Sequence, residues 1–164
     1  MHRAGVMRFQ IFVVIIFLFA SCQTKTEAPE RKDTAPVTDS VRLLLVNLQK
    51  GLSDQGSVVW LDYFDRAPGF YMAVDGQIAF KDYQTAKQFI ETVLVRKIKT
   101  IHLSFNQLRI DSLNNTLASI GAGFHEDLTD STGKTTHADG FLTALAMQTG
   151  GGWKIRNLHW SILK

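Results

Sequence analysis

The apolar residues of this chain change their spacing partway along it, and this change limits the folds that the chain can adopt. Before about residue 95 they recur every three or four positions, as on one side of an α-helix. From residue 101 onward they mostly alternate with polar residues, as in strands with one buried face. The sequence therefore predicts an α+β fold in which helices precede a sheet and pack on one of its faces.

Three helices are expected in the first half of the domain. The first ends near Gly51 or Gly56, a short second one covers residues 58–64, and a third starts at the N-cap residue Asp82. Between the last two, Asp75-Gly76 separates two short apolar runs and favours a hairpin, because this pair tolerates the positive φ of a tight turn. The apolar stripe of the first helix consists of Val41, Leu44, Leu45, Leu48 and Leu52.

Long strands make up the second half. The alternation that starts at Ile101 reverses near Asn106 and Gln107, which predicts a β-bulge that bends the sheet. Further strands are expected over 117–128, 135–148 and 152–163, joined by turns rich in Asn, Asp and Gly. Together they predict a strongly curved antiparallel meander.

Two sets of residues alternate along the last strand. One set begins apolar and becomes polar, so we expect its first members to close the core and its later members to face a pocket. That set is Trp153, Ile155, Asn157, His159 and Ser161, and the opposite set is Lys154, Arg156, Leu158, Trp160 and Ile162.

The N-terminal segment differs from the domain. Arg3 and Arg8 accompany an apolar run over residues 11–20, which is about half of the roughly 20 residues that a spanning helix needs. This pattern is typical of a signal peptide. Cys22, the only cysteine, follows the run and resembles the lipidated cysteine of a bacterial lipobox, although a plain signal peptide with a chance cysteine is an alternative. The true start is Met1 or Met7.

We therefore predict a signal peptide over 1–21, a lipidated Cys22 with a flexible tether over 22–37, and one domain over 38–164. The likeness to a lipobox implies membrane attachment through Cys22, in the cell envelope of a Gram-negative-type bacterium and facing the periplasm. Two of the 18 Lys and Arg and none of the 15 Asp and Glu precede Cys22, which leaves 16 basic and 15 acidic residues. Because these are scattered, no nucleic-acid partner is expected.

The ordered set of elements resembles the SnoaL-like branch of the nuclear-transport-factor-2-like superfamily. The likeness rests on residues 60–64 before a short strand, on the Asp75-Gly76 turn, and on residues 152–155 followed by His159 and Ser161. It is greatest to short uncharacterised proteins that share their terminal strand with the association domain of calcium/calmodulin-dependent kinase. It implies a cystatin-like, cone-shaped barrel that encloses a cavity, and a homodimer formed through the outer face of the sheet.

The same fold hosts isomerases, cyclases, dehydratases and hydrolases as well as proteins without catalysis, so the fold does not decide the function. Steroid isomerases of this fold use an acid on the first short strand, and residues 70–74 contain none. Dehydratases of this fold use two histidines, and Asn157 stands where the second histidine of the last strand is common. A hydrolase-type set could be drawn from Arg109, Asp111 and Asp139, but the first two are expected at an exposed strand end.

Four histidines follow Cys22, each in a different predicted strand: His102, His125, His137 and His159. They could bind a metal, transfer protons, or form hydrogen bonds in a polar pocket. His137 and Asp139 share a face, as required for an imidazole base oriented by a carboxylate. No His-x-His or His-x-x-x-His spacing occurs, so we predict no metal and no cofactor.

These observations favour a lipid-anchored SnoaL-like domain that binds a small, apolar or mixed molecule or acts as an accessory dimerisation module. The alternative is an isomerase, cyclase or lyase with His159 or His137 as base and Asp139 as its partner. A barrel filled by its own aromatic side chains would leave a purely structural role. The expected pocket residues are Trp60, Tyr63, Tyr71, His102, His137, Asp139, Asn157 and His159.

Overall fold

The computed structural model describes residues 35–164. The predicted signal peptide, Cys22 and most of the tether lie outside the described residues. Among the described residues, no helix is both long enough and apolar enough to cross a membrane.

The helices form where the apolar stripes predict them. Helix α1 (Ala35–Gln55) buries the expected stripe, and it ends before Gly56, whose φ of 76° and ψ of −162° form a conformation that glycine adopts readily. The 3₁₀ turn η1 (Ser57–Val59) leads into the short α2 (Trp60–Tyr63). The third predicted helix consists of α3 (Tyr83–Phe89), the π-helical turn η2 (Ile90–Leu94) and α4 (Val95–Lys97). Asp82 caps α3, because its Oδ1 accepts a hydrogen bond from the Thr85 amide at 2.7 Å.

Six strands form one sheet in the order β2-β1-β6-β5-β4-β3. The short strands β1 (Tyr71–Val74) and β2 (Gln77–Phe80) pair across the predicted turn, where Asp75 and Gly76 have φ of 49° and 80°. The long strands are β3 (Ile98–Asn114), β4 (Leu117–Asp130), β5 (Thr135–Thr149) and β6 (Gly152–Ile162). Because β1 runs parallel to β6, the sheet is mixed rather than wholly antiparallel.

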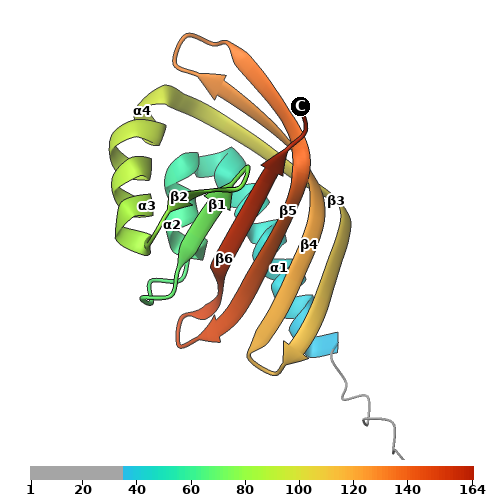
Figure 1. Ribbon diagram of the computed structural model, residues 1–164. Helices are drawn as coiled ribbons and strands as arrows, with labels where there is room; N and C mark the ends of the chain where they lie inside the picture. Colours follow the sequence, from blue (N-terminus) through green and yellow to red (C-terminus); the bar gives the residue numbers. More distant parts are fainter. Residues whose placement is uncertain (1–34) are drawn as a thin grey trace, which may run out of the picture. The chain divides into compact units, whose positions relative to one another are not determined.

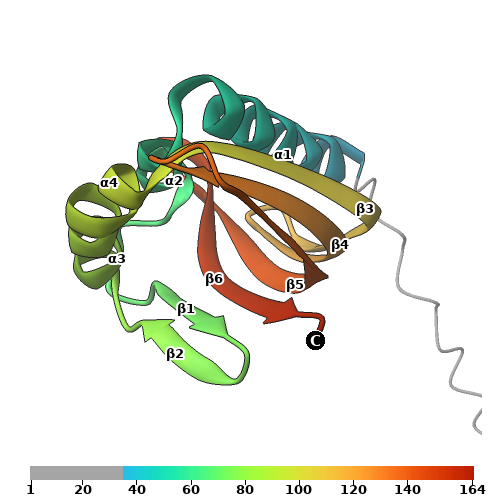
Figure 2. The ribbon, with the colours of Figure 1, turned by 90° about the horizontal axis from the view of Figure 1, so that it is seen from above.

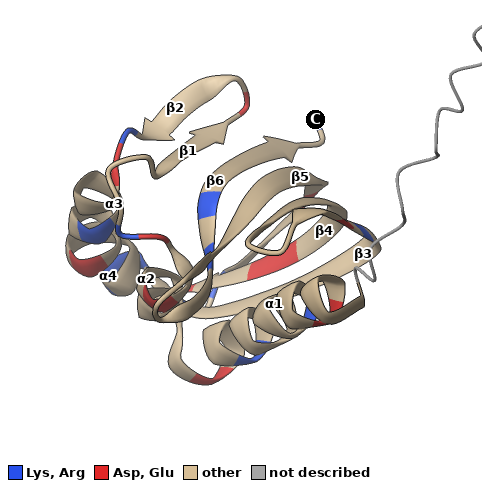
Figure 3. Cartoon of the chain, turned by 90° about the horizontal axis from the view of Figure 1, so that it is seen from below, with Lys and Arg blue, Asp and Glu red and all other residues tan. Residues whose placement is uncertain are grey.

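The sheet curves around the helices without closing into a barrel (Figures 1 and 2). Its two edges are β2 and β3, and α1 lies along the β3 side while α3 lies beside the β1–β2 hairpin. The α+β class and the curved sheet with helices on its concave side are thus confirmed. Basic and acidic residues are interspersed along α1 and along the helical segment formed by α3, η2 and α4, so neither sign of charge dominates these two segments (Figure 3).

Two of the register irregularities in the long strands decide which residues face the core. The predicted bulge in β3 is present between Asn106 and Arg109, where Gln107 has φ of 48°. A second bulge, not predicted, lies in β6. Leu145 pairs with Asn157 and Ala146 pairs with Ile155, which leaves Arg156 as the extra residue.

The β6 bulge corrects the predicted faces of the terminal strand. Past Arg156 the alternation shifts by one position, so the buried residues are Ile155 and then Leu158 and Trp160. Asn157, His159 and Ser161 consequently lie on the opposite, outer face, which contradicts the expectation that they follow Ile155 on one face.

The extra residue, Arg156, forms an ion pair outside the β5–β6 ladder. Its Nε lies 2.6 Å from Oδ2 of Asp65, a residue that is only 5% exposed, although the two groups are not aligned for a hydrogen bond. The Asp65 amide donates to the Ile155 carbonyl at 2.8 Å, so the loop after α2 is attached to β6 at the bulge. A buried ion pair therefore accompanies the change of register.

Candidate functional site

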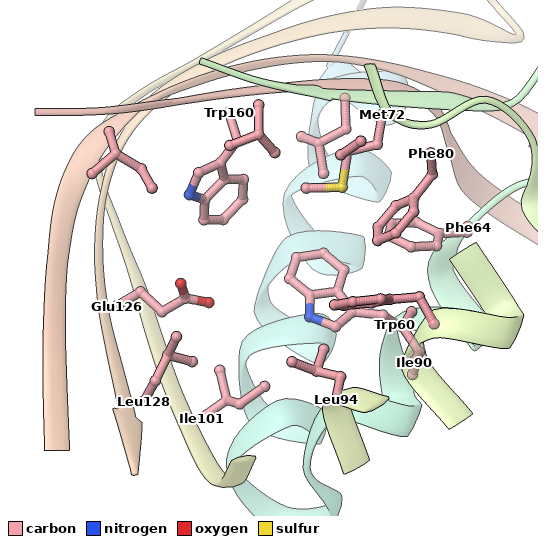
Figure 4. A pocket seen from close by; sticks show the side chains of 15 residues that line it. Trp60, Phe64, Met72, Phe80, Ile90, Leu94, Ile101, Glu126, Leu128 and Trp160 are labelled. Carbon is pink, nitrogen blue, oxygen red and sulfur yellow. The ribbon is translucent and has the colours of Figure 1, made fainter. Parts of the chain in front are cut away.

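A cavity of about 420 Å³ lies between the concave face of the sheet and the helices. Strands β2, β1, β6, β4 and β3 contribute one wall, and α2, α3 and η2 contribute the other. Its lining is mainly aliphatic and aromatic, with Trp60, Phe64 and Phe80 among the larger side chains (Figure 4). This volume lies within the range of about 300–1,000 Å³ that is typical of small-molecule sites.

Glu126 is the one ionisable residue among those that line this cavity. Its carboxyl group points into the space between Trp60 and Trp160 (Figure 4). No hydrogen bond or ion pair joins it to any described residue. Burial among apolar groups raises the pKa of Glu126 to about 7. The carboxyl group therefore changes its charge near neutral pH.

The register of β4 explains why this carboxyl group faces inward. Glu126 pairs with Leu103 on β3 and with Ala138 on β5, and its inward neighbours along β4 are Phe124 and Leu128. Alternation along the strand then places His125 and Asp127 on the outer face. The sequence signal was present: a lone acid stands in the apolar register of a small-residue strand. Glu126 is not among the pocket residues that the sequence predicts.

The expected pocket residues do not converge on one place. Trp60 lines the cavity. Tyr63 is partly buried against the core, and burial raises the pKa of its hydroxyl, with a further contribution from the charge of Asp62. Tyr71, Asn157 and His159 border a separate depression on the outer face, together with Arg109 and Asp111. The β6 bulge is the physical reason why Asn157 and His159 are there and not in the cavity.

The remaining expected residues also lie outside the cavity. The exposed ring of His102 is 3.2 Å from the Ser53 hydroxyl on α1. His137 and Asp139 lie on the outer face, but each contacts a residue of β4 across the ladder. His137 Nδ1 is 2.6 Å from Oδ1 of Asp127, and Asp139 Oδ1 is 2.9 Å from Nδ1 of His125. The expected pairing of a cavity histidine with Asp139 is thus replaced by two pairs on the outer face.

The contacts between histidines and aspartates on the outer face shift the pKa values of His125 and Asp127. The hydrogen bond that His125 donates to Asp139 raises the pKa of His125, with a further contribution from the charge of Asp127. The hydrogen bond with His137 lowers the pKa of Asp127. The outer face therefore holds aspartates in contact with imidazoles, whereas the cavity holds one carboxyl group in apolar surroundings.

No protein-family model matches the sequence, and no curated protein matches it. Several solved structures do resemble the fold. A nuclear transport factor 2-like superfamily protein from Salmonella enterica aligns with 80% of this chain and 94% of its own, at 14% identity and a TM-score of 0.67. A hexachlorocyclohexane dehydrochlorinase from Novosphingobium barchaimii aligns over 80% and 90%, at 11% identity and a TM-score of 0.62.

A Xanthomonas campestris protein, described as a candidate calcium/calmodulin-dependent protein kinase II association domain, aligns over 75% of this chain and 85% of its own. Its identity is 19% and its TM-score 0.61. At such identities the likeness concerns the backbone and not the chemistry of the site. The helices, the curved sheet and these neighbours agree with the resemblance inferred from the sequence: the chain has the nuclear-transport-factor-2-like fold.

Proposed function

We propose that this protein binds a small, largely apolar molecule in the cavity and uses Glu126 to hold the one polar or basic group of that molecule. The observation that carries this proposal is a single carboxyl group in an otherwise apolar cavity of about 420 Å³. Apolar walls favour a ligand through the area that they remove from water, roughly 25 cal/mol per Å². A polar group on the ligand is needed opposite Glu126, because no described residue satisfies this carboxyl group.

The charge of Glu126 defines the ligand further. Near neutral pH both forms of the carboxyl group are populated, because its pKa is about 7. The protonated form donates a hydrogen bond to a carbonyl or ether oxygen, and the ionised form accepts one from an amine or hydroxyl group. An organic anion is excluded from this position above neutral pH by repulsion between like charges.

Binding is tested with 1-aminoanthracene, a fluorescent probe that is apolar apart from one amino group. The matched variants are Leu128→Trp, which fills the cavity, and Leu113→Trp, which adds the same side chain at a position on β3 that is 55% exposed. We expect probe binding to the wild type and to Leu113→Trp, and a loss of at least about tenfold in Leu128→Trp, since overpacking removes the space. Equal affinity of the two variants contradicts the proposal.

A second candidate function is proton transfer by Glu126 in an isomerase, cyclase or lyase reaction. It keeps the predicted reaction classes but replaces the predicted bases His159 and His137, which lie outside the cavity. A carboxyl group with a pKa of about 7 suits a general base at neutral pH. The fold neighbour that is a hexachlorocyclohexane dehydrochlorinase is compatible with chemistry of this kind.

This candidate is tested by exchange of the α-protons of cyclohexanone in deuterated buffer, followed by NMR. The ionised Glu126 would take one α-proton, leaving an enolate, and the carboxyl group would return a deuteron after exchange with solvent. We expect exchange above the buffer rate in the wild type and not in Glu126→Gln. Two variants separate the two functions. If Leu128→Trp loses both exchange and probe binding, exchange requires the cavity. If Glu126→Gln loses exchange but still binds the probe, Glu126 is the base.

We further propose attachment to the cell envelope through a lipid on Cys22, and a homodimer, as the sequence predicts. Lipidation is supported by the position of Cys22 after the apolar run. The homodimer is supported by large apolar side chains that are exposed on β1 and β5, namely Tyr71 at 41% and Phe141 at 47%. Metabolic labelling with an alkyne fatty acid should mark the wild type and not Cys22→Ala. Analytical ultracentrifugation of Phe141→Glu should show dissociation if this face forms the dimer, and an unchanged dimer would refute that interface.

A further inference from the structure

Four chemically active side chains meet on the outer face of the sheet, on the side away from the cavity. His125 and Asp127 lie two positions apart on β4, and His137 and Asp139 lie two positions apart on β5. The register pairs His125 with Asp139 and Asp127 with His137. Each histidine therefore faces an aspartate both along its own strand and across the ladder.

Three of these residues direct one atom each to a common point. Asp127 Oδ1 is 3.0 Å from Nε2 of His125 and 2.6 Å from Nδ1 of His137. The two imidazole rings are nearly parallel, with centroids 6.2 Å apart and an interplanar angle of 17°. One ligand-type atom from each of the three residues lies within 4.8 Å of the others.

We propose that His125, Asp127 and His137 bind a divalent transition-metal ion, for which Zn²⁺ is the natural probe. Two imidazole nitrogens and one carboxylate oxygen form a donor set that suits Zn²⁺ and its neighbours in the first transition row. Bonds of about 2.0–2.2 Å in a tetrahedral site put ligand atoms roughly 3.4 Å apart. The oxygen of Asp127 lies closer than this to both ring nitrogens, at 3.0 and 2.6 Å, so the partly exposed side chains must separate slightly to admit the ion.

Asp139 completes the arrangement as a positioning residue. Its Oδ1 lies 2.9 Å from Nδ1 of His125, the ring nitrogen that does not face Asp127. A hydrogen bond from Nδ1–H to this carboxylate leaves the lone pair of Nε2 directed at the metal position. The two carboxylates also supply two negative charges, which match the charge of a divalent ion when both imidazoles are neutral.

The site is open to solvent and independent of the cavity. The side chain of His137 is 65% exposed, and that of Asp127 is 31% exposed. Three protein ligands leave a fourth position for water or for a group from another molecule. Glu126 stands between two of the ligands in the sequence, but the alternation of β4 directs it to the opposite side of the sheet. The metal proposal therefore does not depend on the proposed ligand of the cavity.

The test is calorimetric titration of the EDTA-treated full-length chain, in detergent, with ZnCl₂. We expect one Zn²⁺ per chain in the wild type, and an affinity at least about 100-fold lower in Asp127→Asn and in His137→Ala, since the first replaces a carboxylate ligand by a neutral amide and the second removes a ring nitrogen. Asp139→Asn should keep the stoichiometry and weaken binding by about 10–100-fold, as is typical of the residue behind a metal-bound histidine. His159→Ala is the matched control, because it removes an exposed histidine of the same face outside the cluster.

Two results overturn this proposal. One is the absence of Zn²⁺ binding to the wild type at millimolar ZnCl₂. The other is binding that Asp127→Asn and His137→Ala leave unchanged, or that only His159→Ala removes. Titration with Co²⁺ gives an independent readout, because its visible absorption bands report a site of low coordination number, and these bands should be lost in Asp127→Asn. Circular dichroism of each variant verifies that the fold is retained.

Discussion

Replacing Glu126 by glutamine should remove a pH-dependent loss of stability from this protein. Glutamine keeps the shape of the protonated carboxyl group but cannot ionise. Burial raises the pKa of Glu126 from an ordinary value of 4.5 to about 7. One pKa unit corresponds to 1.36 kcal/mol, so ionisation of this group lowers the free energy of unfolding by about 3 kcal/mol.

The sign follows from the protons bound in each state. Between pH 4.5 and about 7 the folded protein keeps the proton on Glu126, whereas the unfolded chain has lost it. Below pH 4.5 the contribution of Glu126 to the free energy of unfolding is fully present. It is lost as the pH rises from 4.5 to about 7, at up to about 1.4 kcal/mol per pH unit, and does not change further above that pH. The Glu126→Gln variant should lack this component.

The assay is urea unfolding of both proteins at intervals from pH 4 to pH 8.5, with EDTA present so that divalent ions do not contribute. Subtracting the two free-energy curves cancels the other titrating groups, including His125 and Asp127. The difference should grow by about 3 kcal/mol in favour of the variant across the window. A difference that stays constant within about 1 kcal/mol would show that the carboxyl group is hydrated in the folded state, and it would refute the reasoning from burial.

Three further substitutions test the packing that holds the site. Asp65→Ala leaves Arg156, whose side chain is 22% exposed, without its counter-charge, so urea unfolding should show a loss at the lower end of the about 3–5 kcal/mol that breaking a buried ion pair costs. Leu48→Ala, at a residue 1% exposed on α1, should cost about 2–5 kcal/mol, while Leu43→Ala, 58% exposed on the same helix, should change the unfolding midpoint little. In Gly140→Ala the new Cβ would clash with the backbone carbonyl oxygen of Ser161 on β6 and would lie 2.6 Å from the ring of Phe124 on β4. A cost of about 1–3 kcal/mol is therefore expected from overpacking, and an unchanged melting temperature would contradict the close packing of β5 against its neighbours.

Much of the backbone could be predicted because its determinants are local. The stripe on α1, the cap Asp82 and the Asp75-Gly76 turn each depend on residues within one or two turns of chain. The bulge at Gln107 was also visible, because one extra residue in the strand reverses the apolar alternation that follows it. The bulge at Arg156 was not, since it accompanies an ion pair with Asp65, which is far away in the sequence.

That second bulge separates the expected site from the observed one. A shift of one residue in a strand exchanges its two faces, so Asn157 and His159 lie on the outer side of the sheet and not on the predicted inner side. The pairing of histidines with aspartates likewise depends on the β4–β5 register, which joins His137 to Asp127 and His125 to Asp139. Neither relation is encoded in the spacing within a single strand.

The sequence by itself determined the order of the elements, the α+β class and the likeness to the nuclear-transport-factor-2-like fold, because periodicity and turn chemistry act over short distances. Only the tertiary structure decided which polar groups share a space. It set Glu126 alone in the cavity and assembled His125, Asp127 and His137 on the other side of the same strand. The physical reason is that convergence of side chains from different strands depends on register and curvature, and both are fixed by packing between distant segments.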